Sequence, residues 1–232
     1  MTPSRLVLFD IDGTLLTTLK RAWMHPFADA VAEVFGKRPE LEGFTAGGKT
    51  DPQIVLEMTA PLGVPAEAAW AAVPKVRESY LRRLRDVVRE PEDVVLKPGV
   101  RPLLERLDGE PRAALGLLTG NFEEGARIKL EPHGLNRYFP IGVFGEGARR
   151  RVELAARVEP LALGRLGRAF PGTDTVLVGD TVYDIECARA IGARIVAVAT
   201  GPVPEETLRA AGPDVLFRDL SETDRVLDSI LG

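Results

Sequence analysis

Short, fully apolar runs alternate with longer stretches of helical periodicity along most of this chain. An uninterrupted apolar run of strand length is typical of a strand buried on both faces of a parallel sheet. Regular alternation of such strands with helices predicts a doubly wound parallel α/β sheet. Strands are predicted at residues 6–10, 113–118, 141–144, 175–178, 194–199 and 215–217, and helices at 100–108, 122–130, 152–169 and 182–191, after Pro204 and at the end of the chain.

The segment between the first two strands has a different, all-helical pattern. Apolar residues recur with helical spacing over 19–35, and a second helix begins at a cap formed by Thr50 or Asp51. A third helical stretch covers 65–89, with a break predicted at Pro74. The pattern therefore predicts two units, an α/β core of residues 1–17 and 92–232 and an all-helical insert of residues 18–91.

The composition indicates a soluble globular protein and argues against several other classes. The 232 residues are 45% hydrophobic and 28% charged, which suits a soluble globular protein with a real core. A net charge of -4 argues against a nucleic-acid partner. The single cysteine excludes an internal disulfide framework, no apolar run reaches the roughly 18 residues of a membrane span, and no signal pattern opens the chain. We therefore expect a cytoplasmic protein without a membrane partner.

Polar and acidic residues follow three of the predicted strands at the point where each strand ends. Asp10 and Asp12 follow the first, the triplet Thr119-Gly120-Asn121 follows the second, and Asp180 follows the strand at 175–178, with Asp184 one helical turn later. Parallel strands bring their carboxyl ends to one edge of a sheet, so these groups are expected to lie together. Clustered carboxylates raise one another's pKa or hold a hard cation, and an all-oxygen donor set favours Mg²⁺ over zinc.

The acidic segments resemble motifs of the haloacid dehalogenase superfamily. Residues 10–15, Asp-Ile-Asp-Gly-Thr-Leu, resemble its first motif, DxDGT, and Thr119 fits its second. Residues 179–184 fit its fourth motif, GDxxxD, and the helical insert falls where that family carries a cap. The resemblance implies a Rossmann-like core and a phosphatase of the phosphoglycolate phosphatase-like branch.

The resemblance also implies a role for each residue. Asp10 would take the phosphoryl group as an aspartyl phosphate, and Asp12 would protonate the leaving alcohol and then deprotonate water. Substrate phosphoryl oxygens would be held by Thr119 and the neighbouring Gly120 and Asn121. The Mg²⁺ ligands would be Asp10, Asp12 (through its main-chain oxygen) and Asp180, with Asp184 acting through a water or through another ligand. The presence of Asp12 favours phosphoryl transfer over dehalogenation.

The third motif departs from the family pattern, which has a lysine before the last motif. No lysine follows Lys129 in this sequence. Arg151 is the predicted substitute, because it precedes a helix at a suitable distance from the fourth motif and can donate two hydrogen bonds to phosphate. Arg149 and Arg150 are expected to be solvated, and Arg157 is the fallback.

The insert is expected to act as a lid over the site. Lys49, in the loop 47–51, is its candidate for contact with the substrate, although the same loop also reads simply as a helix cap.

The sequence thus favours a Mg²⁺-dependent phosphatase for a small phosphorylated metabolite, with phosphoglycolate as one candidate. The alternatives are a sugar phosphomutase, another hydrolase of the superfamily, a phosphonate-cleaving enzyme that uses Lys49 as a Schiff base, and an inactive binding module. A homodimer is compatible with the sequence.

Overall fold

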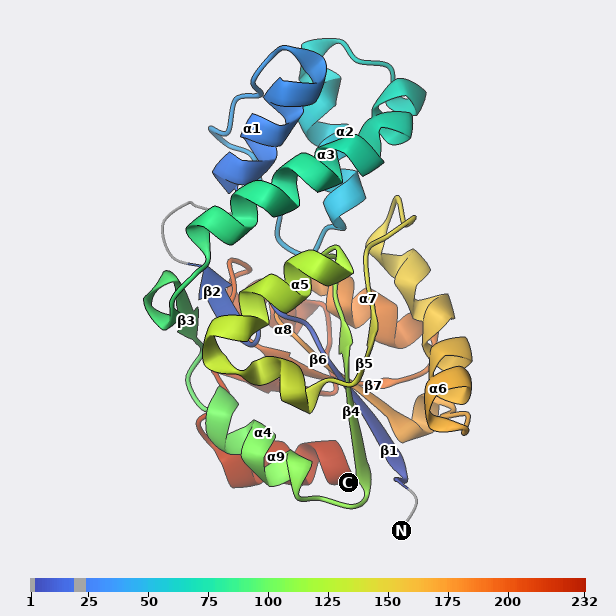
Figure 1. Ribbon diagram of the computed structural model, residues 1–232. Coiled ribbons are helices and arrows are strands. Elements are labelled where there is room, and N and C mark those ends of the chain that lie inside the picture. The colour runs from blue at the N-terminus through green and yellow to red at the C-terminus, as the bar shows by residue number, and fades with distance from the viewer. Residues whose placement is uncertain (1–2, 19–23) are drawn as a thin grey trace.

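The computed structural model describes residues 3–18 and 24–232, and within these ranges six parallel strands form one sheet. Their order is β5-β4-β1-β6-β7-β8, with β1 near the centre (Figure 1). The predicted doubly wound α/β fold is confirmed. The strands are β1 (Arg5–Phe9), β4 (Ala113–Leu118), β5 (Ile141–Val143), β6 (Thr175–Gly179), β7 (Arg194–Val198) and β8 (Val215–Phe217).

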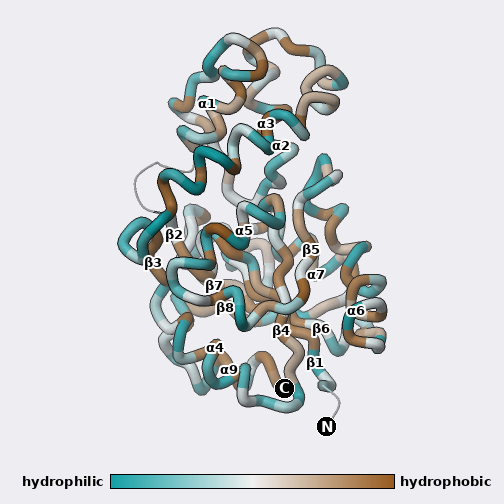
Figure 2. Tube along the Cα trace, viewed as in Figure 1, coloured by the Kyte–Doolittle hydropathy of each residue, from teal (hydrophilic) through white to brown (hydrophobic). Residues whose placement is uncertain are grey.

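Alternating residues of β1 enter two separate hydrophobic clusters, which explains why the strand is apolar throughout. Leu6 and Leu8 face the cluster that includes helices α6 (Val158–Leu166), α7 (Val182–Ala190) and α8 (Glu205–Ala210). Val7 and Phe9 face the cluster that includes α4 (Val100–Asp108), α5 (Glu123–Leu130) and α9 (Thr223–Leu231). A strand covered on both faces has no polar side. Figure 2 shows the hydrophobic strands between helices of mixed hydropathy.

The helices α1 (Met24–Phe35), α2 (Asp51–Thr59) and α3 (Ala66–Val87) pack on one another beyond one edge of the sheet (Figure 1). Residues 19–23 of the first predicted helix lie outside the described residues. Thr50 is the N-cap of α2, because its hydroxyl accepts a hydrogen bond from Gln53 N at 3.1 Å. An antiparallel ribbon of β2 (Leu16–Thr18) and β3 (Val94–Leu96), which the sequence did not predict, joins the segments leading into and out of these helices.

Two predicted helix boundaries are wrong, and proline explains both. Helix α3 continues through Pro74, which lies on its exposed face, where water can satisfy the carbonyl that the proline leaves unpaired. The helix predicted at 152–169 instead begins as a 3₁₀ segment, Arg151–Arg157, and α6 starts only at Val158. That start places Pro160 in the first turn of α6, where its missing N–H costs nothing.

The order in which strands are added to the sheet changes direction at β1. From there the chain runs to β4 and β5 on one side of the sheet, then returns to β6, β7 and β8 on the other. The loops that follow β1, β4 and β6 meet at this switch point, where doubly wound sheets bind ligands. Among the described residues, no helix has the length and apolar character needed to cross a bilayer.

Candidate active site

The turn after β1 places Asp10 at the switch point and contacts Asp180, which follows the neighbouring strand β6. Asp10 keeps β1 geometry, since its N–H donates to Val178 O at 2.9 Å. Gly13 follows with φ +93°, and a Cβ there would overlap the Asp180 carboxylate, so both the backbone and the space require glycine. Thr14 Oγ1 then donates to Asp180 Oδ1 at 2.7 Å. The first motif thus positions an acid of the fourth.

Three carboxylates meet at this edge of the sheet. Asp10, Asp180 and Asp184 each offer an oxygen within 4.8 Å of the others, and all three side chains are buried. The structure therefore brings together the ends of β1 and β6, as the sequence predicted. It also places Asp184 in the cluster itself, where the sequence suggested an indirect role.

Asp184 is fixed by the way helix α7 begins. Its Oδ2 accepts hydrogen bonds from Thr181 N at 3.0 Å and Thr181 Oγ1 at 2.7 Å, which forms a capping box. Its Oδ1 faces Arg151 at 2.5 Å. The residue thus caps a helix and orients a cation at once.

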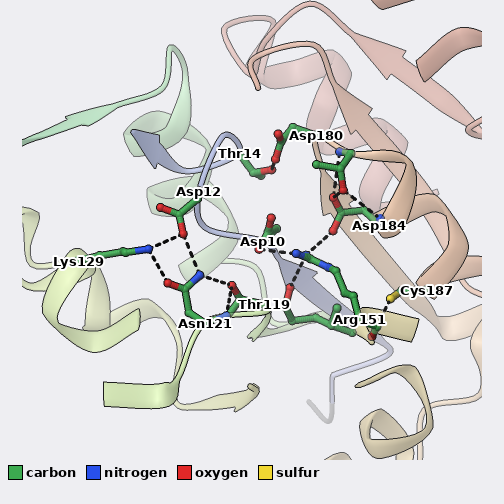
Figure 3. Close-up of polar contacts among 12 residues, drawn as sticks. Asp10, Asp12, Thr14, Thr119, Asn121, Lys129, Arg151, Asp180, Asp184 and Cys187 are labelled. Carbon is green, nitrogen blue, oxygen red and sulfur yellow. Dashed lines mark hydrogen bonds and ion pairs between the residues drawn. The ribbon is translucent and has the colours of Figure 1, made fainter. Parts of the chain in front are cut away.

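Arg151 supplies the positive charge of the cluster. Its Nη2 lies 3.0 Å from Asp10 Oδ1 and 2.5 Å from Asp184 Oδ1, and it donates to Leu118 O at 3.2 Å (Figure 3). One nitrogen therefore contacts the ends of β1 and β4 and the start of α7. Of the predicted arginines, only this one lies against Asp10 in the described part of the chain.

The other arginine candidates have different partners. Arg149 pairs with Glu67 at 2.8 Å and lies over the Trp70 ring, while Arg150 is exposed. Arg157 donates to Glu146 O at 2.6 Å. The geometry thus favours Arg151 for the place that the family pattern gives to a lysine.

Burial shapes the protonation of the acids. Burial raises the pKa of Asp10 to about 6, and Asp184 adds to the rise while Arg151 opposes it. Burial likewise raises the pKa of Asp180 well above its ordinary value, with Asp10 and Asp184 acting in the same direction. Both groups therefore resist ionisation unless further positive charge arrives.

The cluster fits a hard divalent cation. Three ionised carboxylates and one guanidinium would leave two uncompensated negative charges. Asp180 Oδ2 is buried and accepts no hydrogen bond, and buried Asp10 Oδ1 has the Arg151 ion pair. Both are oxygens of the kind that Mg²⁺ prefers. The residues present therefore match the predicted metal in charge and in donor type.

A second polar group lies on the other side of Asp10 (Figure 3). Asp12 is turned away from the acid cluster, and its Oδ2 lies 2.7 Å from Lys129 Nζ and 2.8 Å from Asn121 Nδ2. Asn121 Nδ2 also donates to Thr119 Oγ1 at 2.9 Å. Three predicted residues, Asp12, Thr119 and Asn121, thus share one network.

Lys129 is a site residue that the sequence analysis missed. It is 2% exposed and belongs to the buried face of α5, together with Gly125, Ala126 and Leu130. Its position in the sequence is the signal that would have identified it. Lys129 lies three residues after Ala126 and next to Leu130, and therefore on the apolar face of the helix.

The loop before α2 closes over the site. Asp51 N donates to Gly120 O at 2.7 Å, and Phe122 N donates to Asp51 Oδ2 at 2.7 Å. A Cβ at Gly120 would overlap the main-chain oxygen of Lys49, so glycine permits this approach. Gly120 therefore contacts the helical insert, in addition to any role toward substrate.

Lys49 lines a small cavity at the site but has protein partners. Its Nζ lies 2.5 Å from Glu57 Oε2 and donates to Thr45 O at 2.6 Å. The cavity has a volume of about 40 Å³, and its polar lining includes Asp10, Asp12, Lys49, Asp51, Asn121, Lys129 and Arg151.

Asp51 is the acid that the insert contributes to this lining. Burial raises the pKa of Asp51 to about 7, against the opposing effects of Lys129 and the Phe122 N–H. Its carboxyl group therefore keeps its proton to a higher pH than an ordinary aspartate does.

Comparison with known proteins agrees with this geometry. The family model for haloacid dehalogenase-like hydrolases matches residues 4–192, which include every strand from β1 to β6 and both acidic motifs. The chain belongs to this family. It is therefore a hydrolase, and the predicted resemblance is confirmed.

Individual relatives of this haloacid dehalogenase-like hydrolase carry phosphatase names. It is 28% identical over 217 residues to "Probable phosphatase IndB" of Dickeya dadantii, with 94% of this chain and 90% of that protein covered. It is 28% identical to a phosphoglycolate phosphatase of Synechococcus elongatus, with 93% of each covered. A predicted phosphatase from Clostridium acetobutylicum shares the fold with a TM-score of 0.71 at 19% identity, over 98% of this chain and 100% of that one.

The acid cluster predicts that Mg²⁺ stabilises the protein in a pH-dependent manner. Because the pKa of Asp10 rises from 3.8 to about 6 on folding, its stabilising contribution in metal-free protein is complete below pH 4 and lost as the pH passes 6. Mg²⁺ binds the ionised form, so saturating Mg²⁺ should raise the unfolding midpoint by roughly 5–10 °C at about pH 8 and far less at about pH 5. Thermal unfolding with and without chelator measures this.

Asp180→Asn is the matched variant for that measurement. It keeps the acceptor for Thr14 but removes one ionised ligand, and it should lose most of the shift at the higher pH. An equal shift at both pH values, or a full shift in Asp180→Asn, would contradict cation binding at this cluster.

Proposed function

We propose that this hydrolase is a Mg²⁺-dependent phosphatase that acts on a small phosphorylated metabolite through an aspartyl phosphate on Asp10. The observation that supports this most directly is the buried cluster of Asp10, Asp180 and Asp184 at the switch point, with Arg151 against the proposed nucleophile. A phosphate monoester brings negative charge to a site, and such a site needs fixed cations and a carboxylate that stays ionised. The proposed units are the core of residues 1–17 and 92–232 and the cap of residues 18–91.

In the first half-reaction, an Asp10 carboxylate oxygen forms a bond to phosphorus while the bond to the leaving oxygen breaks. The leaving oxygen takes a proton from Asp12 and departs as an alcohol. The Thr119 hydroxyl and the Arg151 guanidinium contact the phosphoryl oxygens and offset their charge. When bound, Mg²⁺ would supply further charge neutralisation and would be held by Asp10, Asp180 and the main-chain oxygen of Asp12.

In the second half-reaction, Asp12 serves as the base. It takes a proton from water as the water oxygen bonds to phosphorus, and the bond between phosphorus and Asp10 breaks. Asp10 and inorganic phosphate are released, and Asp184 keeps Arg151 in place throughout.

The small volume of the cavity supports a cap that moves when substrate binds. The volume of about 40 Å³ is far below the roughly 300–1,000 Å³ of typical ligand pockets, so substrate entry requires the loop 47–51 to move away from Gly120. Lys49 is the proposed contact for an anionic group on the leaving side, after exchange of its partner Glu57. Phosphoglycolate is one candidate, because a relative is named for it and it carries such a group.

Phosphate release over a panel of phosphorylated metabolites tests the proposed function. Wild-type protein should release phosphate with Mg²⁺ and lose this activity on chelation. Asp10→Asn should lower kcat by at least about 10³-fold, because it removes the carboxylate that accepts the phosphoryl group in this mechanism. Unchanged turnover in Asp10→Asn would contradict the mechanism. Rearrangement of a sugar phosphate without phosphate release would indicate the phosphomutase alternative.

A matched pair of arginine variants tests the assignment of Arg151. Arg151→Met should lower kcat by about 10²–10³-fold, since it removes a buried cation from the phosphoryl site, whereas the exposed neighbour in Arg150→Met should change it less than about twofold. Arg151→Lys restores the charge and should be more active than Arg151→Met. Equal losses in Arg150→Met and Arg151→Met would undo the assignment.

A further inference from the structure

Lys129 is a buried cation that the reaction steps above do not use. Its Nζ lies 2.7 Å from Asp12 Oδ2 and 2.5 Å from Asn121 Oδ1, at the end of a helix that covers the sheet. Removing an ammonium group from water is costly unless strong partners replace the water. One of its partners is Asp12, the residue proposed to transfer protons.

Asn121 extends the influence of Lys129 to a second group. Because its Oδ1 accepts from Lys129, its Nδ2 faces the opposite way and donates to both Asp12 Oδ2 and Thr119 Oγ1. The Thr119 hydroxyl oxygen is thereby used as an acceptor, which leaves its O–H to donate to a phosphoryl oxygen. One lysine thus fixes an amide, and the amide orients a carboxyl group and a hydroxyl group.

Both contacts of Asp12 fall on the same oxygen. With Oδ2 accepting from Nζ and Nδ2, a proton on the Asp12 carboxyl group belongs on Oδ1. Asp12 also lines the cavity beside Asp10, on the side away from Arg151 (Figure 3). Asp12 Oδ2 is thus bound by the protein, and Oδ1 is available for proton transfer.

We propose that Lys129 is a positioning residue which, through its contacts with Asp12 and Asn121, holds Asp12 Oδ1 ready for proton transfer to the leaving oxygen. This inference rests on the proposed phosphatase function. As the bond between phosphorus and the leaving oxygen breaks, that oxygen keeps the electron pair and takes the proton from Oδ1. The products are an alcohol, the phosphoryl group on Asp10, and an Asp12 carboxylate paired with Lys129.

Two other uses of Lys129 give different expectations. A lysine that binds the phosphoryl group would affect all phosphate esters alike, and a lysine that only supports the fold would lower the unfolding midpoint without selecting among substrates. A lysine that positions a general acid matters most when the leaving group is a poor one, because a good leaving group departs without a proton. Dependence on the leaving group therefore separates the three.

The test compares kcat/KM for two esters, 2,4-dinitrophenyl phosphate and the alkyl phosphate that the wild-type protein hydrolyses best. This parameter reports on the steps up to formation of the phosphoenzyme, where the acid acts. Lys129→Met should lower kcat/KM by about 10²-fold for the alkyl ester and by less than about fivefold for the dinitrophenyl ester. Asp12→Asn should show the same selectivity, and adding Lys129→Met to it should cause no further selective loss.

Arg127→Met is the matched control, since it removes a positive charge from the same helix and its side chain donates to Phe139 O away from the cavity. It should affect both esters equally and weakly. If Lys129→Met does not fold, Lys129→Gln keeps a polar group at the position and should show the same selective loss. Equal losses for the two esters, or no loss, in an active wild-type background would overturn the role of Lys129. Absence of phosphate release by the wild type would instead contradict the proposed function itself, and this inference with it.

Discussion

Three buried carboxylates are held close together, and the rest of the site is built around the resulting negative charge. Burial and mutual repulsion raise the pKa of both Asp10 and Asp180. Among the described residues, Arg151 supplies a fixed counter-charge to this cluster, and a single nitrogen of its side chain contacts three segments. The remaining negative charge favours a removable cation, which under the proposed function would allow an anionic ester to approach.

Two groups of polar side chains flank Asp10. On one side lie Arg151, Asp180 and Asp184, which the proposed function assigns to the phosphoryl group and its metal ion, and on the other Lys129 and Asn121 hold the Asp12 carboxyl group (Figure 3). The division follows from topology, because β1 lies between β6 and β4 and its turn sends Asp10 and Asp12 toward different neighbours. The helical insert joins the second side through Asp51, whose pKa burial raises to about 7 while Lys129 opposes the rise.

Much of the fold and of the acid cluster could be predicted from the sequence, because both follow from local patterns. A strand apolar on both faces identifies a parallel sheet, and acids at strand ends then share an edge whatever the details of packing. Helix boundaries near proline could not be fixed, since they depend on whether Pro74 faces solvent and whether Pro160 falls in a first turn. The β2–β3 ribbon was missed because three-residue strands carry no periodicity.

The contacts of single side chains were harder to predict than the elements. Arg151 was selected by its distance from the fourth motif, and its burial against Asp10 agrees. Lys129 was passed over. Its place on the apolar face of α5 indicates burial, but the local sequence does not say that it meets a residue 117 positions earlier. Asp51 was treated as a helix cap, whereas its carboxylate spans from the insert to the Phe122 N–H. Such long-range partners are set by tertiary packing alone.

The central claim is that a divalent cation completes the charge at the meeting of β1 and β6. Crystals soaked with Mn²⁺, a substitute for Mg²⁺ with anomalous scattering, test it directly. The account predicts one strong anomalous peak within bonding distance of the Asp10 and Asp180 carboxylates, absent from crystals of Asp180→Asn. A peak elsewhere on the protein, or an acid cluster that binds no ion in the wild type, would contradict it.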